Sequence, residues 1–328
     1  MKLAEAWYRP MGLRLRIESD RPELLALAEE TFRGFGPAPE GADADLTFIL
    51  ESGPAEGILG EPRFDPVSRR QTAGSAAELA VEGSVARGRF SPAAWQSPAF
   101  LRLHFLELAL YLLLPGRGFL GVHASACVRH GRAALLRAPG GGGKTTLAYA
   151  AARGRFQALA EDVVWIAPDG GVWWGMPWRF RLRPDAARLF PELAGQDANV
   201  GAGLAPAREG VNPSPTSRKI EVDVANAAPS ALPGPVVLLR RRPGGLSRLE
   251  PIGPDEALAR WEEGRGGNEG ETPGYAARVG SLLAEGAYAL EVGDGPGGLD
   301  GALDCLDEAL SEASRRNPSS AATGPSQV

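Results

Sequence analysis

Residues 138–146 are the segment whose residue types and spacing most clearly suit chemistry, and they read Ala-Pro-Gly-Gly-Gly-Gly-Lys-Thr-Thr. The glycines allow backbone N–H groups to turn toward an anion without a Cβ in the way. Lys144 can reach the β- and γ-phosphates of a nucleotide, and the Thr145 hydroxyl can complete the coordination of Mg²⁺. We therefore expect a nucleotide and Mg²⁺ to bind through Gly140, Gly141, Gly142, Gly143, Lys144, Thr145 and Thr146.

The residues on either side must place this loop between a strand and a helix. Residues 133–136 form a short apolar run that is typical of a buried strand, and residues 147–152 favour a helix. Strand, glycine loop, Lys-Thr and helix together form a phosphate-binding loop. The alternative is a flexible glycine linker, which would need neither flank. Ala138 stands where the usual pattern has glycine, and alanine fits there if its φ is negative.

An acidic pair, Glu161-Asp162, lies between the apolar residues 158–160 and 163–167. Carboxylates beside a buried strand cost free energy unless they are paired or bound to a metal. A phosphate-binding loop needs such an acid for Mg²⁺, and a kinase needs a carboxylate that accepts the hydroxyl proton. Neighbouring side chains of a strand point to opposite faces, so both acids can act together only where the strand ends or bulges. The alternative is a solvated acidic turn.

His123 lies in a predicted strand over residues 119–129, within the run Gly-Val-His-Ala-Ser. Its small neighbours leave room for a ligand beside the imidazole. A core histidine that is hydrogen-bonded to the backbone explains the pattern equally well. A turn at His130-Gly131 then returns the chain, so we expect a β-hairpin to lead into the glycine loop.

Basic residues are the candidates for substrate contacts. Arg179, Arg181 and Arg183 alternate with apolar residues, which puts three guanidiniums on one face of a strand. They could meet phosphate or an acidic substrate, or they could form an exposed polar face. Lys219 lies where a predicted loop, residues 195–217, meets a strand at residues 220–224, and it too could contact phosphate or an acid.

Composition excludes several classes of protein. The net charge of −5, with no basic stripe, argues against general nucleic-acid binding. Two cysteines are too few for a disulfide framework or a zinc site, and Cys127 is expected to be a buried structural thiol. The most apolar stretch, residues 105–114, is too short to span a bilayer, and the start of the chain lacks the apolar core of a signal peptide. We therefore expect a cytoplasmic protein with no membrane partner.

The patterning predicts an α/β chain in three parts. Residues 1–92 form a small, mostly β region: strands at 11–19 and 46–50, a helix at 22–35, a loop at 53–72 and a hairpin at 79–90. This region would pack or recognise substrate. Residues 93–313 form the phosphate-loop domain, and residues 314–328 a disordered tail.

The histidine-bearing hairpin, the loop and an acidic pair about sixteen residues after it together resemble the C-terminal catalytic domain of HPr kinase/phosphorylase and its relatives. The layout is most similar to shorter HPr-kinase-like proteins found beside peptide natural-product genes, some of which phosphorylate a serine on a lasso-peptide precursor. The resemblance covers residues 97–313. It implies a P-loop kinase fold, ATP with Mg²⁺, and an oligomer in many members.

By position, the resemblance implies that Lys144 and Thr145 bind phosphate and metal. Of Glu161 and Asp162, one acts as the base toward the acceptor hydroxyl and the other assists the metal, and His123 lies near the reacting phosphate. The sequence departs from the family in having Glu at position 161 and Ala138-Pro139 at the loop start. The stretch tied to the reverse, phosphorolytic reaction has no match, so we expect a kinase and not a phosphorylase.

The expected activity is transfer of the ATP γ-phosphoryl group to a hydroxyl, with a serine of a peptide or protein as the acceptor. One alternative is a small-molecule kinase of the same fold, which would have a deep, closed acceptor pocket. The other is a nucleotide-sensing module that binds ATP without turnover, and replacement of both acids would have been its sequence sign.

Overall fold

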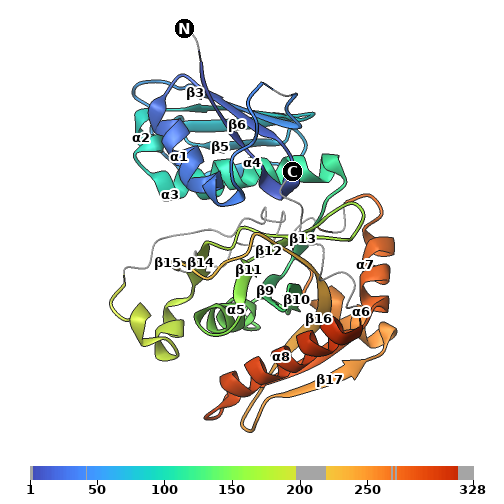
Figure 1. Ribbon diagram of the computed structural model, residues 1–328. Coiled ribbons are helices and arrows are strands. Elements are labelled where there is room, and N and C mark those ends of the chain that lie inside the picture. Colours follow the sequence, from blue (N-terminus) through green and yellow to red (C-terminus); the bar gives the residue numbers. More distant parts are fainter. Residues whose placement is uncertain (1–2, 42, 197–218, 267–268, 270–271, 317–328) are drawn as a thin grey trace. The chain divides into compact units, whose positions relative to one another are not determined.

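The computed structural model describes the chain except residues 1–2, 42, 197–218, 267–268, 270–271 and 317–328. The described residues group into two units, which divide after Phe119 (Figure 1). Both units mix helices with sheets, which confirms the α/β class. The boundary differs from the one that we placed at residue 92, because the helical segment that follows this point packs on the N-terminal sheet.

The first unit is built on one sheet with the strand order β1-β2-β3-β7-β6-β5-β4. Its strands are β1 (Ala4–Tyr8), β2 (Leu15–Ser19), β3 (Leu46–Ser52), β4 (Pro62–Asp65), β5 (Arg70–Ala73), β6 (Ala77–Glu82) and β7 (Val85–Phe90). Apolar and polar residues alternate in β2, so Leu15 and Ile17 are fully buried. The loop predicted over residues 53–72 is wrong, because β4 and β5 pair antiparallel there.

Helices cover this sheet, namely α1 (Pro22–Phe32), α2 (Pro92–Trp95), α3 (Pro98–Leu101) and α4 (Leu108–Leu113). The continuous helical segment Pro98–Arg117 is, among the described helices, the one long and apolar enough to cross a membrane. It is longer than the apolar stretch that we considered, but it is mostly buried and contacts α1, β6 and β7. This burial is consistent with a core helix of a soluble protein.

The second unit contains a mixed sheet with the order β11-β9-β10-β16-β13-β12-β8, and β18 joins β16 to β17. Its strands are β8 (Leu120–His123), β9 (Ser125–Arg129), β10 (Arg132–Arg137), β11 (Gln157–Ala160), β12 (Val163–Ile166), β13 (Trp173–Trp174), β16 (Ser230–Arg242), β17 (Arg248–Ile252) and β18 (Ala287–Gly293). The strands β10, β16 and β18 run parallel to one another. The predicted hairpin is confirmed, since β9 and β10 pair antiparallel across His130 and Gly131, both with positive φ.

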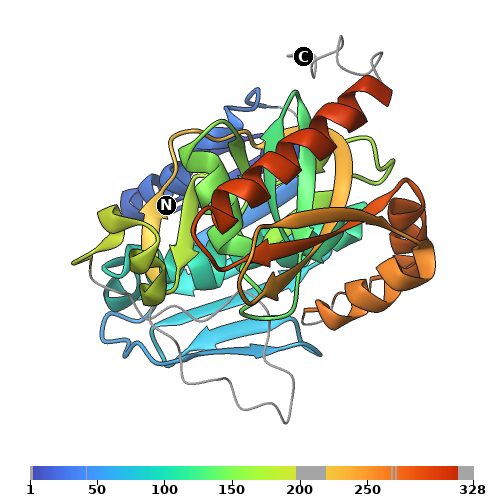
Figure 2. The ribbon, with the colours of Figure 1, turned by 90° about the horizontal axis from the view of Figure 1, so that it is seen from below.

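Helices lie on both faces of this sheet: α5 (Lys144–Arg153) and α8 (Gly298–Arg316) on one, and α6 (Pro254–Glu263) and α7 (Tyr275–Ala284) on the other (Figures 1 and 2). The alternation of strand side chains explains the two layers. Val237 and Leu239 of β16 pack with α5 and α8, whereas Val236 and Leu238 pack with α6 and α7. The central strands are therefore apolar on both sides.

Residues 184–193 form two short 3₁₀ turns, Pro184–Arg188 and Pro191–Leu193. The predicted end of the folded chain needs correction. The last helix continues to Arg316, so residues 314–316 of the expected tail are helical, while the rest of that tail lies outside the described residues. The predicted loop at 195–217 also lies almost wholly outside them. A separate antiparallel pair, β14 (Arg179–Leu182) and β15 (Ile220–Asp223), flanks this segment.

Candidate functional site

The glycine loop connects the end of β10 to the start of α5, as the sequence predicts. Gly141 and Gly143 have φ values of +79° and +96°, a backbone conformation that residues with a side chain rarely adopt. A Cβ on Gly142 would lie 2.6 Å from the Cβ of Ala138, so the loop folds back too closely for any other residue. Ala138 is not among the described residues with positive φ, and this meets the condition under which alanine can replace the usual glycine.

The N-cap residue of α5 is Gly143, which has no side chain to cap the helix. The first backbone N–H groups of α5 therefore receive no capping hydrogen bond from the N-cap residue. These groups and the positive end of the helix dipole favour a bound phosphate. Thr145 and Thr146 lie half-buried in this first turn.

Lys144 is held inside the loop. Its Nζ donates to the carbonyl oxygen of Ala138 at 2.8 Å, and the side chain is buried. Burial lowers the pKa of Lys144, and Asp162 acts in the opposite direction by favouring the charged ammonium. The ammonium is therefore placed at the loop but carries a desolvation cost, which an anionic ligand would offset.

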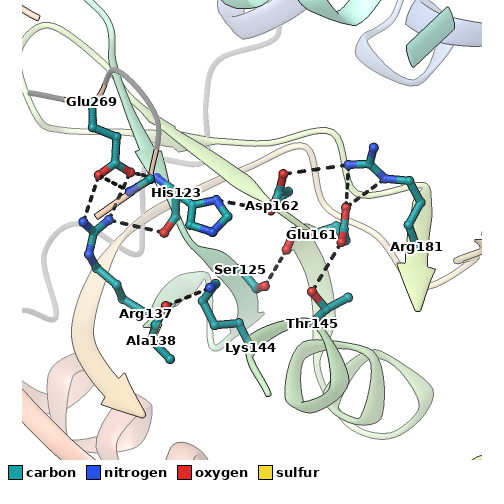
Figure 3. Close-up of polar contacts among 11 residues, drawn as sticks. His123, Ser125, Arg137, Ala138, Lys144, Thr145, Glu161, Asp162, Arg181 and Glu269 are labelled. Carbon is teal, nitrogen blue, oxygen red and sulfur yellow. Dashed lines mark hydrogen bonds and ion pairs between the residues drawn. The ribbon is translucent and has the colours of Figure 1, made fainter. Parts of the chain in front are cut away.

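The acidic pair lies in the break between β11 and β12, where the two side chains can diverge (Figure 3). One Glu161 oxygen accepts a hydrogen bond from Thr145 Oγ1 at 3.3 Å. Its other oxygen accepts from Arg181, with Nη2 at 2.8 Å and Nε at 3.2 Å. Asp162 turns instead to His123, whose Nδ1 lies 3.2 Å from Oδ1. A solvated acidic turn does not describe this arrangement, because Glu161 is 6% exposed.

Asp162 keeps a charge in spite of its partial burial. Desolvation by burial raises the pKa of Asp162, but the cations around it outweigh this and hold the pKa below its usual value. The cations are Arg181, Lys219 and Lys144, and His123 acts in the same direction when it is protonated. A carboxylate that stays ionised beside a phosphate-binding loop can accept a proton or contact a metal.

His123 combines features of both interpretations that the sequence left open. It ends β8, pairs across the sheet with Val163, and its side chain is 25% exposed. Its imidazole contacts Asp162, while its backbone N–H donates to the carboxylate of Glu269. The histidine is therefore fixed through its backbone and presents its ring to the acidic pair.

Two residues of this network, Arg137 and Glu269, were not singled out in the sequence. Arg137 Nη2 lies 2.8 Å from Glu269 Oε2, and Nη1 lies 3.1 Å from Oε1. The guanidinium also stacks on Trp261, with Cζ 4.0 Å from the ring centroid, and Nη1 donates to the His123 carbonyl at 3.3 Å. An arginine at the end of the apolar run before the loop was the one available sequence signal. Glu269 gave none, since it lies in a glycine-rich segment with no apolar pattern.

The basic substrate candidates separate in the structure. Arg181 joins the acidic pair, and Lys219 contributes to the electrostatics of Asp162. Arg179 does not join them, because its guanidinium pairs with Asp223 of β15 at 3.2 Å. Arg183 lies beside the loop, with Nη1 3.6 Å from the position of a Cβ on Gly141.

The oxygen donors fit a magnesium ion of the kind found with nucleotides. Within the described part of the chain, no group of three or more His, Cys, Asp and Glu side chains could hold a metal. Mg²⁺ at nucleotide sites instead uses one or two carboxylates, a hydroxyl and the substrate phosphates. Thr145 and Glu161 are hydrogen-bonded to each other and could supply the hydroxyl and one carboxylate, while Asp162, the third expected ligand, faces His123.

Comparison of the chain with models of protein families, and with curated proteins, found no match. The function of this protein is therefore inferred from the geometry of this site.

Proposed function

We propose that this protein is an ATP-dependent kinase that transfers the γ-phosphoryl group to a hydroxyl. One observation carries the proposal: the acidic pair connects to the phosphate loop through Thr145 and Glu161, while the adjacent Asp162 faces His123. This arrangement supports a role for one acid at the metal and for the other at the acceptor hydroxyl. Phosphoryl transfer by a P-loop enzyme needs both a ligand for the metal and a group that orients or deprotonates the attacking hydroxyl.

In the proposed reaction the acceptor oxygen forms a bond to the γ-phosphorus, and the bond from that phosphorus to the β–γ bridging oxygen breaks. The hydroxyl proton passes to Asp162, and ADP leaves. Lys144 and the N–H groups at the start of α5 bind the phosphates, and Thr145 with Glu161 would hold Mg²⁺. When bound, Mg²⁺ would supply charge neutralisation on the phosphates. Positioning and electrostatics account for most of the catalysis in this class of reaction.

Arg181 orients the acidic pair in this scheme. Its guanidinium contacts Glu161 directly and lies 3.9 Å from Asp162 Oδ2. Its positive charge is one of the causes that hold the pKa of Asp162 below its usual value.

The order of histidine hairpin, loop and acidic pair supports a fold and activity like those of HPr kinase/phosphorylase. We propose a peptide or protein serine as the acceptor and the cytoplasm as the location, in line with the shorter relatives of that family. The forward reaction is favoured because the sequence lacks the stretch tied to phosphorolysis.

The test is ATP turnover by the purified protein with Mg²⁺, with and without candidate acceptor peptides encoded beside its gene. We expect phosphate on a peptide serine, no turnover by Lys144→Ala, and retained nucleotide binding without transfer by Asp162→Asn. Unchanged transfer by both variants would contradict the proposal. ATP binding without transfer to any peptide or small hydroxyl compound would indicate a nucleotide-sensing module instead.

A further inference from the structure

Two runs of arginines each bring one guanidinium close to the glycine loop, and neither of these two guanidiniums pairs with an acid among the described residues. The first run is Arg179, Arg181 and Arg183, on and just after β14. The second is Arg240, Arg241 and Arg242, at the carboxyl end of β16. Both runs belong to the second unit, as does the loop.

In the first run, the two arginines within β14 are neutralised by carboxylates. Arg179 pairs with Asp223 at 3.2 Å, and Arg181 pairs with Glu161 at 2.8 Å. Arg183 is exposed and has no ion pair or hydrogen bond from its guanidinium to the residues that the structure describes. Its Nη1 lies 3.6 Å from the position of a Cβ on Gly141, in the middle of the loop.

The second run repeats this pattern. Arg240 pairs with Glu263 at 3.0 Å, and Arg242 pairs with Glu291 at 3.2 Å. Arg241 points to the opposite face of β16, as strand alternation requires, and pairs with no described carboxylate. Its Nε and Nη2 lie 3.8 Å and 4.0 Å from the position of a Cβ on Gly143, the residue before Lys144.

Positive charge therefore gathers beside the loop: Asp162 favours the charged form of Lys144, whereas Arg183 and Arg241 pair with no carboxylate among the described residues. Two guanidiniums and the ammonium of Lys144 repel one another, which costs free energy unless an anion binds among them. A guanidinium binds phosphate oxygens through paired, charge-assisted N–H donors. Two guanidiniums beside the loop therefore suit a ligand with several phosphate groups. The guanidinium of each side chain lies next to a loop glycine, so both can reach the same ligand as the loop N–H groups.

We propose that Arg183 and Arg241 bind the phosphate chain of the nucleotide, as two guanidinium contacts in addition to Lys144. This inference rests on the proposed nucleotide site. Its two binding residues lie 58 positions apart in the chain, Arg183 just after β14 and Arg241 on β16. The neighbouring, acid-paired arginines have no such role.

The experiment compares the affinity of the full chain for MgATP between variants, by isothermal titration calorimetry. Arg183→Gln and Arg241→Gln each remove one charge-assisted contact, and we expect each to raise Kd about tenfold. The matched controls are Arg179→Gln for the first run and Arg242→Gln for the second, which cause the same change in net charge. We expect the controls to stay within about twofold of the wild type, because their charges are already paired.

The outcomes separate this inference from the proposed function. If the wild type binds MgATP and Lys144→Ala loses binding, while Arg183→Gln and Arg241→Gln bind as the wild type does, the inference fails and the nucleotide site stands. Equal weakening by test and control variants would likewise overturn it, since that reports net charge alone. If the wild type binds no MgATP, the proposed function fails and the arginine contacts fail with it.

Discussion

The guanidinium of Arg137 and the carboxylate of Glu269 form a two-point ion pair across 132 residues of sequence, with contacts of 2.8 and 3.1 Å. Their side chains are 0% and 2% exposed. The pair connects the segment after α6 to the last residue of β10, directly before the glycine loop. Both partners also hydrogen-bond the backbone of His123, so one buried contact fixes the position of that histidine.

Removing one partner of this pair should be costly. Glu269→Gln leaves the buried guanidinium of Arg137 without its counter-charge, and we expect a loss of about 3 kcal/mol of unfolding free energy. Urea denaturation measures it. The control is Glu263→Gln, whose exposed partner Arg240 should make the cost less than about 1 kcal/mol. Equal effects of the two changes would show that the buried pair adds nothing beyond a surface contact.

Arg181 should matter for turnover more than for nucleotide affinity. Arg181→Gln removes the cation between Glu161 and Asp162, and we expect kcat to fall at least about tenfold while the Kd for ATP changes little. Steady-state kinetics and direct binding measure the two quantities. Arg179→Gln is the matched control on the same strand, because its partner Asp223 lies outside the acidic pair. A wild-type kcat for Arg181→Gln would remove that residue from the site.

Because the pKa of Asp162 is lowered in the folded state, part of the free energy of unfolding should depend on pH and be lost in acid. The folded pKa of Asp162 is depressed, and the unfolded value is about 3.9. The stabilisation is therefore fully present above the unfolded pKa and is lost as the pH falls through the lower, folded pKa. Asp162→Asn should be less stable than the wild type at pH 7, and the difference should shrink below about pH 4. Thermal unfolding as a function of pH measures it, and a pH-independent difference would contradict the assignment.

The two cysteines should differ in reactivity. Burial raises the pKa of Cys127 to about 12, so its thiolate is scarce at neutral pH and its sulfur is inaccessible. Cys305 is partly exposed on α8. At pH 8 a thiol reagent should modify Cys305 in the native protein and Cys127 only after unfolding in guanidinium chloride. In the Cys305→Ser variant, labelling of the native protein should disappear. Rapid labelling of Cys127 in the native protein would instead show that β9 is not a buried strand.

The elements around the loop could be predicted from the sequence, because each depends on residues that are close together in the chain. The glycines of the loop, the Lys-Thr start of α5 and the β9–β10 hairpin follow from local conformational preferences and from strand alternation. The β4–β5 hairpin was missed because its residues are mostly polar or exposed, so no apolar periodicity marks it.

The partners of the charged side chains were decided only by the tertiary structure. Arg179 and Arg181 are both arginines and lie two positions apart on β14, yet Arg179 pairs with Asp223 and Arg181 pairs with Glu161. Alternation determines which face of a strand a side chain occupies, but the carboxylate that meets it there depends on how distant segments pack. For the same reason, the residues around Glu269 do not indicate that it pairs with Arg137. The buried charge of Arg137 requires a counter-charge, and only the packing of distant segments determines which residue supplies it.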